Sequence, residues 1–185
     1  MQKFINTIVS LFKAPELRKR VLIILGLLMM FRLTANVPLP DVDLARIKEL
    51  LSSNQFLGIL NVFSGNTLSN MSIAMLGVGP YITAIIIMQL LTLIYPKFKQ
   101  MYYEEGEAGK AKFNQYARLA TIPLAFLQGF GFLKFLQSQN ILLFSSSYAM
   151  FRDIMIITAG TMFLMWIGEL ITEQKLANGV SLIIF

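Results

Sequence analysis

Residues 61–96 read NVFSGNTLSNMSIAMLGVGPYITAIIIMQLLTLIYP, a small polar run followed by an apolar run that is interrupted at Gly77-Val78-Gly79-Pro80. The piece after the interruption, residues 81–95, would make roughly 22 Å of helix. A single helix needs about 20 residues to cross a membrane, so residues 73–76 would have to complete the span through a break. Proline removes a backbone donor and glycine permits a bend, so the freed carbonyls need partners from protein or water. The stretch predicts a broken span behind a polar half-helix, as in proteins that line a pathway; the alternative is an ordinary kink in a packed bundle.

Composition places the whole chain in a membrane. Of its 185 residues 56% are hydrophobic and only 14% are charged, and the mean hydropathy is +0.64, which excludes an ordinary soluble domain. We therefore expect an all-α, polytopic membrane helical bundle. The absence of cysteine and histidine excludes thiol chemistry, disulfides, an imidazole base and a zinc cluster. The net charge of +6 is scattered among apolar segments, so membrane topology explains it better than nucleic-acid binding does.

Polar and apolar runs divide the chain into successive segments. Residues 1–16 form an amphipathic pattern with lysines outside, which predicts a helix lying on the cytoplasmic membrane surface or packed on the bundle. In order along the chain we then expect span one at 17–37, an external loop at 38–60, the polar half-helix at 61–72, the broken span two at 73–96, a cytoplasmic loop at 97–117, span three at 118–136, an external loop at 137–152, span four at 153–171, a cytoplasmic loop at 172–178 and the start of span five at 179–185. Because the sequence stops inside an apolar segment, we expect it to belong to a longer protein.

The basic residues predict the orientation. With the N-terminus inside, 11 of the 16 lysines and arginines fall on the cytoplasmic side and four fall outside. The remaining one, Arg32, stands at the outer edge of the first span, where its long side chain can reach the interface. This asymmetry follows the positive-inside rule, so we expect a cytoplasmic N-terminus.

Two glycine-containing motifs do not match the patterns of nucleotide-binding sites. The run Glu105-Gly106-Glu107-Ala108-Gly109-Lys110 lacks the first glycine of a phosphate loop, since Glu104 stands there, and Ala111 replaces the final Ser or Thr. The run Gly77-Val78-Gly79 lacks a third glycine and a preceding strand, so it predicts no dinucleotide site.

The acidic residues form no metal or catalytic pattern. Glu169 is the one that merits attention, because an acid inside a membrane segment is a functional candidate, here for a proton relay. The simpler interpretation is that it reaches the interface, four residues before the loop residue Glu173. The sequence therefore predicts no enzyme, no cofactor and no metal site.

Two aliphatic pairs share a helical spacing. Val78 and Ile82 are four residues apart, as are Val180 and Ile184, so each pair lies on one helix face. Two such faces beside a broken helix can form a hydrophobic constriction that stops ions by dewetting. The alternative is that all four are ordinary core or lipid-facing residues.

Several blocks of sequence resemble the SecY family of protein-conducting channels. The first signature region of the family is similar to Ser64-Gly65, Leu68-Ser69, Leu76-Gly77, Pro80-Tyr81-Ile82 and Gln89-Leu90-Leu91, and its second is similar to residues 158–185, TAGTMFLMWIGELITEQKLANGVSLIIF. The family's loop between the second and third spans resembles residues 105–110 with Gln115-Tyr116 and Arg118, and its first span and exit resemble Arg18-Lys19-Arg20, Phe31-Arg32 and Pro38-Leu39-Pro40. The chain departs from the family pattern at four positions. Glycine is usual where this chain has Asn66, Lys175 and Ala177, and a basic residue is usual where it has Asn70.

The resemblance implies a fold and roles for particular residues. The fold has ten spans in two pseudo-symmetric halves around an hourglass pore, and this chain would supply the N-terminal half, four spans and the start of the fifth. The implied plug, a re-entrant half-helix, includes Phe63, Ser64, Gly65, Leu68, Ser69 and Met71. The implied pore ring takes Val78, Ile82, Val180 and Ile184 from this half. The implied lateral gate, where signal sequences leave for lipid, includes Gln89, Thr121 and Gln128.

The resemblance also implies a function, partners and a location. It implies the central pore subunit of the Sec translocon, which passes unfolded secretory polypeptides and releases signal sequences and membrane spans into lipid. The implied partners are the SecE and SecG subunits, the SecA motor ATPase, the ribosome, signal peptides, nascent polypeptides and membrane lipid, with no specific nucleic-acid sequence. The implied location is the cytoplasmic, or inner, membrane of a bacterium.

Two other classes of protein compete with the channel. A secondary transporter would hold a small substrate at the broken helix and should carry convergent polar or charged groups there. The break is instead lined by Gly, Val, Pro and Ile, which favours a channel. A purely structural membrane subunit would not explain a polar half-helix next to a broken span.

Overall fold

The all-α class expected from the composition is confirmed. The structure is a computed structural model that describes residues 15–40, 49, 52, 55, 58, 59, 62, 69–138 and 146–184. Within these residues one isolated bridge, between Pro38 and Ser72, is the sole β feature. The helices are α2 (Pro15–Ala35), α5 (Gly79–Ile94), α6 (Pro96–Tyr103), α7 (Gly106–Ser138), α8 (Ser147–Glu173) and α9 (Gly179–Ile184).

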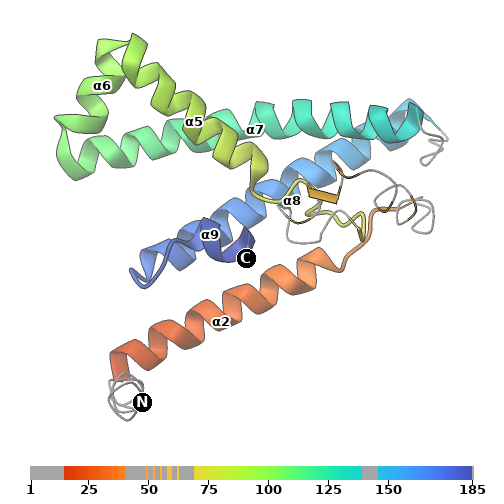
Figure 1. Ribbon diagram of the computed structural model, residues 1–185, viewed down its shortest axis with the longest axis horizontal. Helices are drawn as coiled ribbons and strands as arrows, with labels where there is room; N and C mark the ends of the chain where they lie inside the picture. Colours follow the sequence, from red (N-terminus) through yellow and green to blue (C-terminus); the bar gives the residue numbers. More distant parts are fainter. Residues whose placement is uncertain are drawn as a thin grey trace.

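Helix α8 is the common neighbour of the other long helices (Figure 1). It packs against α7, α2 and α9, while α5 and α6 pack against α7. Figure 1 shows the N-terminal end of α2, the α6 elbow and the turn between α8 and α9 toward the left, with the C-terminal ends of α2 and α7 toward the right. A hydrogen bond links the N-terminal part of α2 to the C-terminal end of α8, since Arg20 Nη1 donates to the Gln174 carbonyl at 3.1 Å. The long helices α2, α5, α7 and α8 run in alternating directions in Figure 1, as successive membrane spans do.

Length and composition single out membrane-crossing helices. Helices α7 and α8 are each long and apolar enough to cross a membrane, and α5 with α6 adds a third if that pair, bent by 111°, is one span. The bend lies at Tyr95, which is extended with φ −109° and ψ 116°. Its cause is Pro96, because a residue before proline is disfavoured in the helical conformation.

Helix α2 is not among these membrane-length apolar helices. It is 21 residues long, but Arg20 and Arg32 confine its uncharged apolar run to residues 21–31. A span over residues 17–37 therefore requires the arginines to reach the interfaces with their long side chains, and it stays a prediction.

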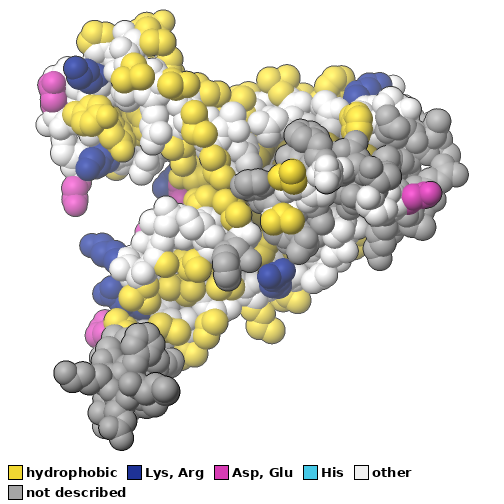
Figure 2. Space-filling model, in the orientation of Figure 1, with side chains coloured by type: hydrophobic (Ala, Val, Ile, Leu, Met, Phe, Trp, Pro, Cys, Tyr) yellow, Lys and Arg dark blue, Asp and Glu magenta, His cyan; other side chains and the backbone are white. Residues whose placement is uncertain are grey.

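Exposed apolar side chains cover the outer faces of the helices (Figure 2). They lie along α2, α5 and α7, where a soluble protein would carry charge, and include Leu22, Leu25, Met29, Leu90, Leu93, Ile94, Leu119, Leu127 and Phe130. Figure 2 shows lysine and arginine side chains mainly toward the left-hand ends of the helices. Apolar flanks with charged ends are what a bilayer requires of a helical bundle.

The region predicted as a cytoplasmic loop is helical. Residues 97–117 fall in α6 and in the first turns of α7, with a short turn at Glu104 and Glu105 between them. Pro96 starts α6 at a position where its missing N–H costs nothing, and Gly106, at φ +65°, permits the reversal before α7. Charged residues of high helix propensity can form the solvent face of a helix, so the assignment of residues 97–117 to a cytoplasmic connection between spans stays a prediction.

The segment before α5 is not helical. Residues 73–76, counted as the completion of the broken span, lie in turns instead, and Gly77 takes the left-handed conformation at φ +58°. Two backbone hydrogen bonds hold this segment to the end of α2, from Leu39 N to the Met71 carbonyl at 2.8 Å and from Ile73 N to the Val37 carbonyl at 3.0 Å. The chain therefore enters α5 from a joint of turns that is held in place by these hydrogen bonds.

Some sequence predictions fall on residues that the structure does not describe. They are the amphipathic helix up to residue 14, most of the external loop at 38–60, most of the half-helix at 61–72 and part of the loop at 137–152.

Candidate functional site

The four aliphatic residues predicted to line a constriction meet in one apolar cluster. Val78 is fully buried at the start of α5, and Ile82 follows it by one helical turn, with Ile82 N donating to the Val78 carbonyl at 3.0 Å. Val180 and Ile184 come from α9 and pack against the same cluster. The remaining buried members come chiefly from α8 and α2 and include Leu164, Ile167, Ile171, Ile24 and Phe31. The structure thus brings together two pairs that lie about 100 residues apart in the sequence. Their role as a pore ring stays a prediction.

A close approach of two glycines positions α9. Gly179 packs directly on the Gly168 carbonyl of α8, where an added Cβ would overlap that oxygen and lie 2.8 Å from its carbon. Thr172 reinforces the contact, because its hydroxyl donates to the Gly168 carbonyl at 2.8 Å and accepts from Gly179 N at 2.9 Å. The approach sets Val180 against α8 and so delivers the second aliphatic pair to the cluster.

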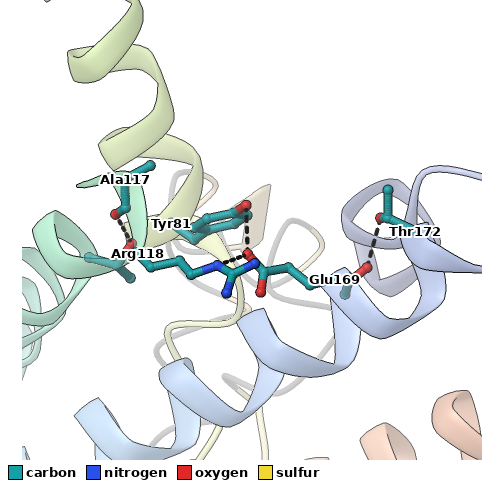
Figure 3. Close-up of polar contacts among 7 residues, drawn as sticks. Tyr81, Ala117, Arg118, Glu169 and Thr172 are labelled. Carbon is teal, nitrogen blue, oxygen red and sulfur yellow. Dashed lines mark hydrogen bonds and ion pairs between the residues drawn. The ribbon is translucent and has the colours of Figure 1, made fainter. Parts of the chain in front are cut away.

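Beside the aliphatic cluster, polar side chains from two helices donate to one carboxylate oxygen on a third helix (Figure 3). Arg118 Nε of α7 donates to Glu169 Oε1 of α8 at 2.6 Å, and the Tyr81 hydroxyl of α5 donates to the same oxygen at 3.3 Å. The Glu169 side chain is only 14% exposed, whereas that of Arg118 is 44% exposed. We call these three residues the polar junction.

Sequence reasoning missed the polar junction. The sequence identifies Glu169 as an acid inside an apolar segment, and Arg118 as a basic residue of the region that resembles the family's loop between the second and third spans. An acid within a membrane segment needs a partner, so the demand for a cation was visible. The choice of Arg118, which is 51 residues away, depends on α7 packing against α8, and no local pattern gives that.

The three predicted gate residues lie on adjacent helices in different surroundings. Gln89 of α5 is exposed, and Gln128 of α7 is half-buried. Thr121 of α7 is fully buried, and its hydroxyl donates to the Ala117 carbonyl of its own helix at 2.8 Å. Helices α5 and α7 pack against each other, but these three side chains form no shared polar cluster among the described residues.

The predicted plug is described only in part. Phe63, Ser64, Gly65 and Leu68 lie outside the described residues, and Ser69 is half-buried. Met71 is fully buried, with a left-handed φ of +42°. It packs with Leu39, Met75, Leu133, Leu136, Ile154 and Ile157 in a cluster separate from the one that holds Val78.

No metal-binding group stands out in the part of the chain that the structure describes. There, no three or more acidic, histidine or cysteine side chains are close enough together to hold an ion.

Comparison with known proteins decides the family. The model of the SecY family matches residues 72–185, which include α5 to α9, the four cluster residues and the polar junction. The chain belongs to the SecY family. The match begins after the predicted plug residues and includes the whole broken-span region from Ser72 onward.

Relatives in several bacteria agree over almost the whole chain. A protein named "Protein translocase subunit SecY" from Synechocystis is 40% identical over 183 residues, which are 97% of this chain and 40% of the relative. Proteins of the same name from Streptomyces coelicolor and from Buchnera aphidicola of Schizaphis graminum are each 40% identical, over 190 and 176 residues. They cover 94% and 92% of this chain, which in turn spans 43% and 40% of them. The chain thus spans about two fifths of the length of these relatives.

Proposed function

We propose that this chain forms one wall of a channel that conducts unfolded polypeptides across a bacterial inner membrane. The observation that carries the proposal is the apolar cluster that joins Val78 and Ile82, at the start of α5, to Val180 and Ile184 of α9. The relatives are named as subunits of a protein translocase, which is the function that such a wall would serve.

The chemistry of the cluster suits a gate that blocks ions but admits a chain. A narrow ring of aliphatic side chains expels water, and an ion then faces the cost of losing its hydration shell. An extended polypeptide can displace the same side chains, because aliphatic contacts are non-directional and tolerate any sequence. Val78 precedes α5 in the joint, and Ile82 lies in the first helical turn, so both stand at the end of the helix rather than in its middle.

The gate and the plug complete the proposed mechanism. Helices α5 and α7 would form one side of a lateral gate, with the exposed Gln89 as the side chain most accessible to a signal segment. The segment 61–72 would close the external side as a plug. Packing between apolar helix faces in lipid lacks the strong hydrophobic drive present in water, so such a gate can open at modest cost.

The proposed partners follow from the same family assignment. SecE and SecG would complete the complex, and the SecA ATPase or the ribosome would supply the driving force and the polypeptide. Transport itself would then require no catalysis by this chain. We place the N-terminus in the cytoplasm, in keeping with the excess of basic residues on that side.

A secondary transporter would need a polar site at the broken span. The buried side chains of the cluster that holds Val78 are apolar, and the nearby Tyr81, Arg118 and Glu169 bind one another. Among the described residues, that pairing leaves no further convergent polar group at the break, which favours the channel.

Precursor transport into sealed vesicles tests the proposal. A full-length SecY chain carrying these 185 residues, purified with its companion subunits, should bring a secretory precursor into a protease-protected state when SecA and ATP are supplied. The same precursor without its signal segment is the matched control and should remain digestible. Digestion of both precursors, together with saturable uptake of a small solute, would support the transporter and contradict the proposal.

A further inference from the structure

The polar junction ties together three helices that are distant in sequence. Tyr81 and Glu169 are 88 residues apart, and Arg118 and Glu169 are 51 residues apart, yet all three meet on Glu169 Oε1 (Figure 3). Such a contact stabilises the packing between helices rather than any helix by itself. Its loss would change how α5, α7 and α8 pack against one another.

The junction is attached to both halves of the aliphatic cluster. Tyr81 is the residue before Ile82 on the first turn of α5. Glu169 follows Gly168, and a Cβ built on Gly168 would lie 3.3 Å from the Ile183 side chain and 3.5 Å from that of Val180. Tyr81 and Glu169 are each one peptide unit away from a residue that belongs to the cluster or contacts it. A shift of either side chain would therefore move the cluster.

We propose that Arg118 and Glu169 are positioning residues of the constriction. They hold Tyr81, and with it the first turn of α5, against α8, so that the aliphatic cluster stays closed until a polypeptide arrives. The inference rests on the proposed channel function and assigns to that channel the contact that sets its resting state.

Electrostatics give the contact its strength. The Arg118–Glu169 hydrogen bond is short, at 2.6 Å, and joins two charges, which makes it stronger than a bond between neutral groups. The Glu169 carboxylate is largely buried, so removal of Arg118 would leave a buried charge without its partner. Because apolar faces in lipid associate weakly, a polar contact of this kind can decide between the closed and the open arrangement.

Charge exchange separates this role from simple support of the fold. In the full-length complex we would compare Arg118→Glu, Glu169→Arg and the double exchange. The matched control exchanges Glu105, in the turn before α7, and Lys112 of α7, whose exposed side chains form an ion pair at 3.9 Å. Ion leak through sealed vesicles reports the resting state, and precursor transport with SecA and ATP reports the channel function.

The proposal predicts a specific pattern of leak. Each single exchange should raise the leak about tenfold or more, since about 1.4 kcal/mol lost from the closed state changes its population tenfold. The double exchange should bring the leak back toward that of the unchanged channel, and the control exchange should leave it unchanged. Tyr81→Phe, which removes only the longer hydrogen bond of 3.3 Å, should raise the leak by a smaller factor.

Two results would overturn the proposal. One is a leak from both single exchanges no greater than that of the control pair while precursor transport proceeds. The other is a double exchange that leaks as much as the worse single exchange. If a single exchange prevents folding, Tyr81→Phe and the double exchange still decide the matter, because an unchanged leak in the first and a high leak in the second contradict the proposed role. Absence of precursor transport in the unchanged channel would instead refute the proposed function, whatever the leak shows.

Discussion

Replacing Gly160 by alanine should destabilise the chain at the contact between α8 and the joint before α5. Gly160 lies on the backbone of that joint, and a Cβ built there would overlap the Ile73 carbonyl oxygen and lie 2.8 Å from its carbon. It would also lie 3.4 Å from Ala74 N. Backbone atoms cannot swing aside as the end of a flexible side chain can, so residues 73 and 74 would have to move by about 1 Å to restore van der Waals contact.

The cost follows from comparison with a second glycine. Overpacking of a close contact costs about 1–3 kcal/mol, whereas Gly to Ala within a helix gains up to ~1 kcal/mol from helix propensity. Gly131 of α7 has no atom within 4 Å of an added Cβ, so Gly131→Ala carries only the gain. Propensity cancels between the two variants, and Gly160→Ala should be the less stable by about 1–3 kcal/mol.

Equilibrium unfolding of the two variants in detergent measures this difference. Both should be purified as the full-length complex and followed by loss of helical signal against denaturant. Gly160→Ala should unfold at lower denaturant than Gly131→Ala, and the unchanged protein should lie between them. Equal stability of the two variants would mean that residues 73 and 74 do not lie against α8 as described, and the argument for a fixed joint would fail.

Two further predictions concern the gate and the loop before α9. Gln89 is exposed on α5, so a photoreactive residue in its place should crosslink to a signal segment. A photoreactive residue in place of the fully buried Thr121 should not. Crosslinking from position 121 alone would contradict the prediction and place the gate on a different face. Lys175 has a left-handed φ of +56°, which glycine adopts easily and a β-branched residue does not. Lys175→Val should therefore have a free energy of unfolding about 1–3 kcal/mol lower than that of Lys175→Gly. Equal stability of the two variants in chemical unfolding would contradict backbone strain at this position.

Local features of the fold could be predicted from the sequence. Pro96 marked the end of α5, and the run from Gly77 to Pro80 marked the place where turns give way to α5. The spacing of four placed Val78 with Ile82 and Val180 with Ile184. These features depend on residues close together in the chain, where proline, glycine and helical periodicity act directly.

Contacts between distant segments could not be predicted in the same way. The meeting of the two aliphatic pairs depends on Gly179 packing against Gly168, and that approach is visible only once α8 and α9 are in place. The partner of Glu169 was likewise undetermined, because any of several basic residues could have supplied the cation. Resemblance to a family supplied roles for the aliphatic residues but not the contact that joins Arg118 to Glu169.

The secondary structure of the charged region after α5 could also have been predicted. Its lysines and glutamates have high helix propensity, and α7 buries Phe113 and Ala117 on its inner face. Two apolar residues four apart within a charged run were the signal for a helix.

Site-specific crosslinking at Ile82 tests the central claim most directly. The 185 residues contain no cysteine, so Ile82→Cys and, on the exposed face of α2, Leu25→Cys each add a single thiol to this part of the chain. A polypeptide with a central thiol-reactive probe would be stalled in the full-length channel. The account predicts a strong crosslink at Ile82 and none at Leu25. Equal labelling at both positions, or none at Ile82 while export proceeds, would contradict the assignment of the aliphatic cluster to the pore.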